Sequence, residues 1–471
     1  TLRFLSTAQA AEDLEALRRY LGADTMTIYG AADGSLLAQA YAAAHPAQVW
    51  RLILDAPLDP GVADLDRLAE AARASDQVLT ATLAECATAA PCTRDVVGKD
   101  ALAAFDGLMT SLVQEPKIVE LTNGSGGTTT RTVGAADLAL VAQTWLGTER
   151  DRMLLQRAIA AASQGRWWHL VRMLDLVRQG RLGPGAAPEQ AGATEAARLA
   201  IACADADLGP GSDEDRASAW LAAARVTEAT DTRLARMLAA DLPCAFWPGR
   251  PAAGGAAEGD ADGAGLVVEP AFPVLLLGAT LDPSAPWANG ERIASRAGAD
   301  HVQTLVTAGG PHITYGRTRD CPDTAMTALL ASGTEPEAAG TCTGAVADAY
   351  VPIAPATRDQ VGGTKTALLG ADREIVNLPD LAVWAGESPL RVGCPFGGTV
   401  AYAKGDGRTE LNLDRCAFTK GVPVTGTGTL VGFAGALELT LDSGDPAAPV
   451  TYRRLPGENP TVTGVLKGLS R

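Results

Sequence analysis

The chain has few aromatic residues, few histidines and no long apolar run. Phe, Trp and Tyr make up 5% of its 471 residues, and there are 4 histidines. No stretch of about 18 consecutive apolar residues occurs, so the sequence predicts no membrane-spanning helix. The cysteines lack the C-x-x-C spacing of a zinc site and few histidines are available as other ligands, so we expect no metal and no cofactor.

Basic residues are also in short supply. The chain has 39 Lys and Arg against 55 Asp and Glu, a net charge of −16, and no cluster of basic residues offsets this balance. Binding DNA or RNA requires a concentrated basic face, so the composition argues against a nucleic-acid partner. The apolar fraction of 47% and charged fraction of 20% are typical of a soluble globular protein, and the length suits two or three domains.

The 8 cysteines fall into near-neighbour pairs, which favours four disulfides over eight buried thiols in a cytosolic protein. We therefore expect a secreted, extracellular protein, with a signal peptide upstream of Thr1 that processing or truncation has removed. The predicted pairs are Cys86–Cys92, Cys203–Cys244, Cys321–Cys342 and Cys394–Cys416.

Residues 25–41 organise the rest of the chain. They predict a short apolar strand, a tight turn of small residues and a helix that folds back against the strand. Such a turn needs small side chains where strand and helix cross, and Gly30, Ala31 and Gly34 supply them. In the G-x-S-x-G nucleophile elbow the central serine projects from this turn. The centre of the frame here is Ala32, so the elbow is present and its nucleophile is absent.

The flanking pattern indicates a parallel sheet. Helices are predicted at 6–22 and 35–44, and strands at 25–29 and 49–54, the second strand being almost continuously apolar. The order helix, strand, helix, strand is half of a doubly wound α/β sheet. Strands at 273–277 and 302–306, each followed by a helix, resume the same pattern.

The remaining segments predict two other domains. Residues 61–265 are rich in helical patterns, broken by a hairpin at 117–133, and we interpret them as a helical cap inserted between core strands. Residues 343–471 have short alternating runs that favour a β-rich domain, a small sandwich or roll. Within the cap, Arg166-Trp-Trp-His169 could line a substrate pocket, but packing is favoured. Residues 251–265 predict a mobile surface loop.

Several stretches resemble the secreted tripeptidyl- and prolyl-aminopeptidase group of α/β-hydrolases from actinobacteria. The resemblance is good over residues 1–60 and 266–342, loose in between and unclear after about 345. It implies an α/β-hydrolase core formed by 1–60 and 266–342. The family's Ser, Asp, His order falls on Ala32, Asp282 and His312. The stretches are 6–18, 44–57, 274–283 and 309–316.

The family also implies parts that precede this chain's first strand. One oxyanion donor would be the backbone N–H of Asp33, and the second comes from a loop after an early strand that is missing here. We therefore expect an N-terminal fragment, cut before Thr1, to remain bound and to complete the sheet and the oxyanion loop. Simple truncation of the sequence is the alternative.

Asp282 and His312 each follow a predicted strand. The carboxyl ends of parallel strands are where ligands meet open α/β sheets, and a carboxylate there can fix the tautomer of an imidazole. Alone, Asp282 could be a turn residue before Pro283 and His312 a surface histidine. Together with the elbow, in the family's order, they predict a catalytic triad.

Other residues near the elbow give weaker signals. If the G-x-S-x-G motif is aligned one residue later, on residues 31–35, Asp33 becomes the nucleophile. The first glycine of the motif then falls on Ala31, which argues against this alignment. Ser35 lies in the first turn of the following helix, where its hydroxyl is expected to cap. We assign no role to His45 or His301.

The sequence thus predicts a serine exopeptidase in a form without its nucleophile. Alanine differs from serine by one oxygen atom, and natural decay would be expected to spread to Asp282 and His312, so a deliberate replacement at Ala32 is favoured. The expected partner is a peptide or acyl substrate. An esterase or other acyl hydrolase on the same scaffold, or a pseudoenzyme that binds peptides in the cap cleft, are the alternatives.

Overall fold

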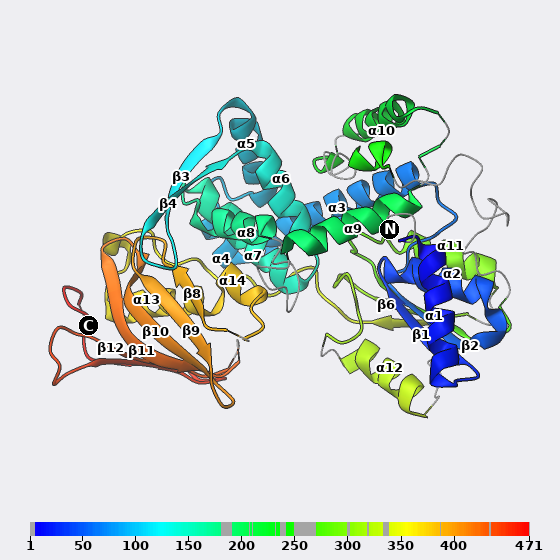
Figure 1. The fold of residues 1–471 in the computed structure, drawn as a ribbon. Coiled ribbons are helices and arrows are strands. Elements are labelled where there is room, and N and C mark those ends of the chain that lie inside the picture. Colours follow the sequence, from blue (N-terminus) through cyan, green and yellow to red (C-terminus); the bar gives the residue numbers. More distant parts are fainter. Residues whose placement is uncertain are drawn as a thin grey trace. The chain divides into compact units, whose positions relative to one another are not determined.

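The computed structural model divides the chain into two compact units (Figure 1). Unit 1 comprises Thr1–Glu85, Ala142–Arg152 and Gly192–Asp348, and unit 2 comprises Cys86–Val141, Met153–Ala191 and Ala349–Arg471. The structure describes residues 5–179, 191–206, 208–209, 211–230, 232–235, 242–248, 270–298, 302–317, 320–332, 339–386, 388–432 and 435–470. The predicted loop at 251–265 and His301 lie outside these residues.

Unit 1 is built on a parallel sheet of five described strands, in the order β1-β2-β5-β6-β7. Every neighbouring pair is parallel, as the strand–helix alternation predicts. Among the described strands, β1 pairs with β2 alone and lies at the edge. The strands are β1 (Met26–Ala31), β2 (Val49–Asp55), β5 (Val274–Ala279), β6 (Val302–Thr307) and β7 (Ala339–Cys342).

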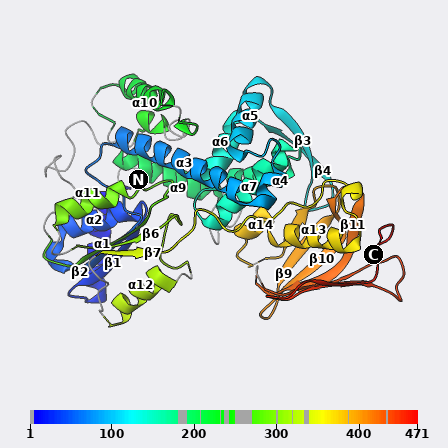
Figure 2. The ribbon, with the colours of Figure 1, turned by 180° about the vertical axis from the view of Figure 1, so that it is seen from behind.

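Helices cover both faces of this sheet (Figure 2). Alternate residues of β2 and β5 point to opposite faces, so a continuous apolar run serves two cores. One face, with Leu52, Leu54 and Leu276, packs against α1 (Thr7–Leu21), α2 (Gly34–Ala44) and α11 (Ala288–Ala297). The other, with Ile53, Leu275 and Leu277, packs against α12 (Asp320–Ser332). The sequence patterns predicted all four helices.

A second group of helices completes unit 1. It comprises α3 (Asp64–Glu85), α9 (Ala191–Asp205), α10 (Asp213–Glu228) and the short helix η6 (Leu242–Phe246). Cys203 of α9 and Cys244 of η6 form a disulfide, which lies in a small core with the buried Trp220. All four predicted disulfides are confirmed, the others being Cys86–Cys92, Cys321–Cys342 and Cys394–Cys416.

Unit 2 combines helices with antiparallel sheets. The predicted hairpin is confirmed as β3 (Lys117–Thr122) and β4 (Thr128–Val133). The helices are α4 (Ala90–Asp95), α5 (Ala101–Gln114), α8 (Trp168–Arg178), α13 (Thr364–Val376) and α14 (Pro379–Ala382), with parts of α6 (Ala135–Thr144) and α7 (Glu149–Ser163). The helical segment predicted as one cap therefore contributes to both units, and its role as a cap stays a prediction.

The C-terminal region forms one seven-stranded antiparallel sheet in which consecutive strands are neighbours. The β-rich C-terminal region predicted from the sequence is confirmed, but its described strands form one sheet and not the two packed sheets of a sandwich. Helix α13 lies on the sheet, because Tyr402 donates to the Ile375 carbonyl and Tyr452 to the Asp372 carboxylate. The strands are β8 (Leu390–Gly393), β9 (Thr399–Lys404), β10 (Thr409–Thr419), β11 (Val422–Leu430), β12 (Leu437–Leu441), β13 (Val450–Arg454) and β14 (Thr461–Thr463).

Candidate active site

The turn between β1 and α2 has the geometry of a nucleophile elbow. Ala32 has φ +49°, in the left-handed region that non-glycine residues rarely adopt. At Gly30 a Cβ atom would lie 2.7 Å from Ala38 Cβ, so only glycine fits where strand and helix cross. Gly34 is different, because a Cβ there would meet nothing within 4 Å. The prediction that the turn requires small residues is therefore confirmed at Gly30, whereas the space around Gly34 would admit a larger side chain.

Asp282 and His312 meet beyond the carboxyl ends of β5 and β6. The imidazole Nδ1 of His312 lies 2.8 Å from both carboxylate oxygens of Asp282. Asp282 is 2% exposed, and its Oδ1 also accepts the backbone N–H groups of Ser284 and Ala285 at 2.8 Å. The carboxylate therefore stabilises its own turn and orients the imidazole, leaving Nε2 as the nitrogen available for proton transfer.

The environment favours the protonated form of His312. Burial alone would lower its pKa, but the hydrogen bond and charge of Asp282, with the charges of Asp55 and Asp33, outweigh burial and raise it. An imidazole with a raised pKa is a stronger base once deprotonated, which suits a group that must take a proton.

Backbone hydrogen bonds hold the loop that carries His312. Gly309 has φ +81°, its N–H donates to Thr280 Oγ1 at 2.8 Å, and its carbonyl accepts the Leu281 N–H at 2.7 Å. The N–H of His312 itself donates to the Gly147 carbonyl at 2.8 Å. The loop before His312 is thus hydrogen-bonded to the segment before Asp282, which holds the two side chains within hydrogen-bond distance of each other.

Arg152 supports the same loops and was not identified from the sequence. Its buried guanidinium donates to the carbonyl oxygens of Leu146 at 2.7 Å, Val346 at 2.9 Å and Leu281 at 2.7 Å. Burial lowers its pKa, although nearby carboxylates oppose that shift. A Cβ at Gly310 would lie within 3.0 Å of this guanidinium, so the glycine before Pro311 makes room for it.

The other residues singled out near the elbow have different surroundings. Asp33 is exposed and stands at the N-cap position of α2, where its side chain makes no capping bond. The hydroxyl of Ser35 is buried and accepts the N–H of Leu58 at 2.9 Å, so the predicted capping role for Ser35 is wrong. His45 Nε2 lies 3.0 Å from Glu12 Oε1. In unit 2, Trp168 and His169 are buried, which confirms packing for these two residues.

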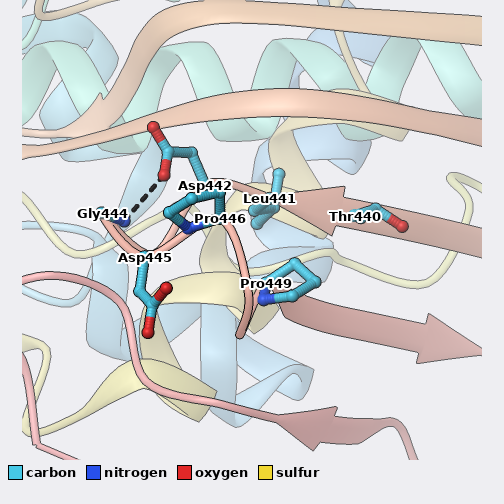
Figure 3. A pocket seen from close by; sticks show the side chains of 7 residues that line it. All are labelled: Thr440, Leu441, Asp442, Gly444, Asp445, Pro446 and Pro449. Atoms are coloured by element: carbon cyan, nitrogen blue, oxygen red, sulfur yellow. Dashed lines mark hydrogen bonds between the residues drawn. The ribbon is translucent and has the colours of Figure 1, made fainter.

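Within the described ranges, no group of three or more His, Cys, Asp and Glu residues is arranged to hold a metal ion. None of the helices described is long and apolar enough to cross a membrane. A pocket in unit 2 lies beside the loop after β12 and contains none of the predicted catalytic residues (Figure 3). Its two carboxylates accept backbone N–H groups of that same loop, Asp442 from Gly444 and Asp445 from Ala447.

Comparisons with known proteins found several similarities. Residues 232–342 match the family described as TAP-like protein. The serine protease Hip1 of Mycobacterium tuberculosis and that of Mycobacterium bovis are each 25% identical over 349 residues, 72% of this chain. The chain covers 62% of the length of these relatives. An α/β-hydrolase fold protein from Nakamurella multipartita aligns with a TM-score of 0.23 and 10% identity, covering 65% of this chain and 69% of that one.

Proposed function

We propose, from the premise that this chain is a TAP-like α/β-hydrolase, that it is built for serine peptidase chemistry and that residue 32 is the position of the nucleophile. The observation that carries the proposal is the bond between His312 and the buried carboxylate of Asp282. The left-handed turn at Ala32 supports it, since this conformation projects the central residue of an elbow.

The roles of the residues follow from this geometry. A serine hydroxyl at position 32 would give its proton to His312 Nε2 as it attacks a carbonyl carbon, and His312 would return the proton to the leaving group. Asp282 stabilises the imidazolium that forms between the two steps. The backbone N–H of Asp33 would be one oxyanion donor, as the N–H after the nucleophile is in this fold. With alanine at position 32 there is no hydroxyl there for His312 to activate, so the chain is expected to have almost no hydrolytic activity.

The substrate class proposed is a peptide cleaved from its amino end. The serine-protease relatives support a peptide substrate, and the aminopeptidase resemblance supports exopeptidase action. The four disulfides support export from the cell, since such bonds persist in oxidising compartments.

The test is the Ala32→Ser variant of the complete protein, with both oxyanion donors present, assayed on aminoacyl nitroanilides and on acyl esters. Hydrolysis should rise by many orders of magnitude, since loss of a triad serine costs on the order of a million-fold in subtilisin. A fluorophosphonate probe should label residue 32, and Asp282→Asn or His312→Ala should abolish the gain. Preference for the ester would indicate an esterase instead. If Ala32→Ser stays silent while Asp33→Asn abolishes activity already present, Asp33 is the nucleophile and the serine proposal fails.

A further inference from the structure

Asp55, the last residue of β2, is fully buried and receives several hydrogen bonds from the segment after His312. The N–H of Thr314 lies 3.0 Å from each carboxylate oxygen, and the Thr314 hydroxyl lies 3.0 Å from Oδ1. The N–H of Tyr315 lies 2.9 Å from Oδ2. The carboxylate therefore fixes the backbone two and three residues beyond the proposed general base.

The same residue also contacts the elbow. Its Oδ2 accepts the hydroxyl of Tyr29 at 3.0 Å, and its backbone carbonyl accepts the N–H of Ala32 at 2.9 Å. Tyr29 and Tyr315 pack edge to face with ring centroids 5.8 Å apart, so the two segments also touch through their side chains. Asp55 is thus bonded both to the turn that presents residue 32 and to the loop that presents His312.

We infer that Asp55 is a positioning residue, which sets the His312 loop against the nucleophile elbow. The inference rests on the proposed function, because only a reaction between residue 32 and His312 needs the two segments in fixed register. A misplacement of about 1 Å in such a site can cost on the order of a hundredfold in rate. Asp55 touches neither substrate nor reacting atoms and acts through the two loops.

A carboxylate is required here, and an amide cannot replace it. Both oxygens of Asp55 accept hydrogen bonds, and every partner is an N–H or O–H donor. In Asp55→Asn the amide NH₂ would point hydrogens at one set of those donors, leaving them unpaired in a buried place. The carboxylates that act on His312 are Asp282, Asp55 and Asp33, so removing one of three negative charges also changes the imidazole.

The first measurement is an NMR titration of the His312 imidazole in the chain with Ala32, where no activity is needed. Four histidines give few signals, and His312→Ala assigns the one of interest. Asp55→Asn should shift the His312 titration to lower pH and broaden the amide signals of residues 312–315. The matched control is Asp59→Asn, since Asp59 is equally buried but bonded to Arg292 and Arg296 of α11. Unchanged His312 signals in Asp55→Asn overturn the inference.

If Asp55→Asn does not fold, two conservative variants test the same inference in the same NMR measurement. Thr314→Val and Tyr29→Phe each remove one hydroxyl donor to Asp55 and keep the side-chain shape. Either should change the 312–315 amide signals more than the Asp59→Asn control does, and no difference from that control overturns the inference.

Kinetics separate this inference from the proposed function. In the Ala32→Ser background, Asp55→Asn should lower kcat on the order of a hundredfold with little change in KM, because positioning acts on the chemical step. An unchanged kcat overturns the inference while leaving the function intact. An inactive Ala32→Ser protein in which Asp55→Asn still alters the His312 signals refutes the proposed function and supports the role of Asp55 in holding the loop.

Discussion

At the scale of single residues, the candidate site depends on side chains whose partners are distant in sequence. Asp282 and His312 could be predicted because each follows a strand and their order matches a known pattern. Arg152 and Asp55 could not. Each is recognisable only by what it bonds in space, since 129 residues separate Arg152 from Leu281 and 259 separate Asp55 from Thr314. No motif marks a helical arginine or a strand-terminal aspartate as a support for a distant loop.

The raised pKa of His312 makes a prediction about pH. In Ala32→Ser, the base is competent only when neutral, so kcat/KM should fall as the pH drops through the pKa of His312. Adding Asp55→Asn to Ala32→Ser removes one of the charges that raise this pKa, so the remaining activity should persist to lower pH. A pH–rate profile of the two variants checks this. An acid limb that does not move would contradict the assignment of His312 as the base.

At the scale of elements, buried charges join three helices of unit 2. Glu374 of α13 lies 2.9 Å from Arg157 of α7 and 2.8 Å from His169 of α8, with all three side chains almost fully buried. Burial alone would raise the pKa of Glu374, but the charge of Arg157 and the hydrogen bond with His169 outweigh it and hold that pKa well below its usual range. Burial lowers the pKa of His169, so a charged Glu374 and a neutral His169 are favoured.

Glu374→Gln should destabilise unit 2 strongly, because it leaves Arg157 buried without its counter-ion. Removing one partner of a buried pair costs about 3–5 kcal/mol in the free energy of unfolding. Chemical denaturation at neutral pH measures it. The control is Glu438→Gln, which removes an exposed partner of Arg453 and should cost less than about 1 kcal/mol. Equal effects in the two variants would contradict a structural role for the buried cluster.

The same cluster predicts acid sensitivity. The folded pKa of Glu374 is depressed, so its contribution to stability is fully present above the unfolded value of about 4.3 and is lost as the pH falls toward the folded value. The stability difference between the native chain and Glu374→Gln should therefore shrink below about pH 4. Denaturation curves at several pH values test it, and a constant difference would be contrary to this account.

At the scale of the whole molecule, most helices and strands could be predicted from the sequence, whereas the division into domains stays a prediction. Composition changes near residues 61, 265 and 343 suggested the boundaries, whereas the compact units cut the chain at residues such as 85/86 and 152/153. An apolar helix face shows that a helix is packed, not which neighbour it packs against. For the same reason the alternation in 390–463 predicted strands correctly but did not reveal that a helix covers their sheet.

Two compact units with separate cores predict two unfolding transitions. Glu374→Gln should lower the midpoint temperature of the transition that belongs to unit 2. Replacing Cys203 and Cys244 together by alanine removes the cross-link in unit 1. It should lower the free energy of unfolding of unit 1 by about 2–4 kcal/mol and so lower the temperature of its transition. Scanning calorimetry of the three proteins distinguishes the transitions. If both variants shift one common transition, the units unfold as a single cooperative body.

The hydrogen bonds of Asp55 also constrain when the candidate site can assemble. Its bond to Tyr29 spans 26 residues, but its bonds to Thr314 span 259. During synthesis the elbow and β2 leave the ribosome before the loop that carries His312. Until that loop is made, the Asp55 carboxylate lacks its donors from Thr314 and Tyr315. Contacts this far apart in the chain are slow to form, because a long loop must close before they are made. A nascent chain whose synthesis has not yet passed Thr314 and Tyr315 therefore cannot hold the histidine loop against the elbow, even if β1 and β2 have already folded.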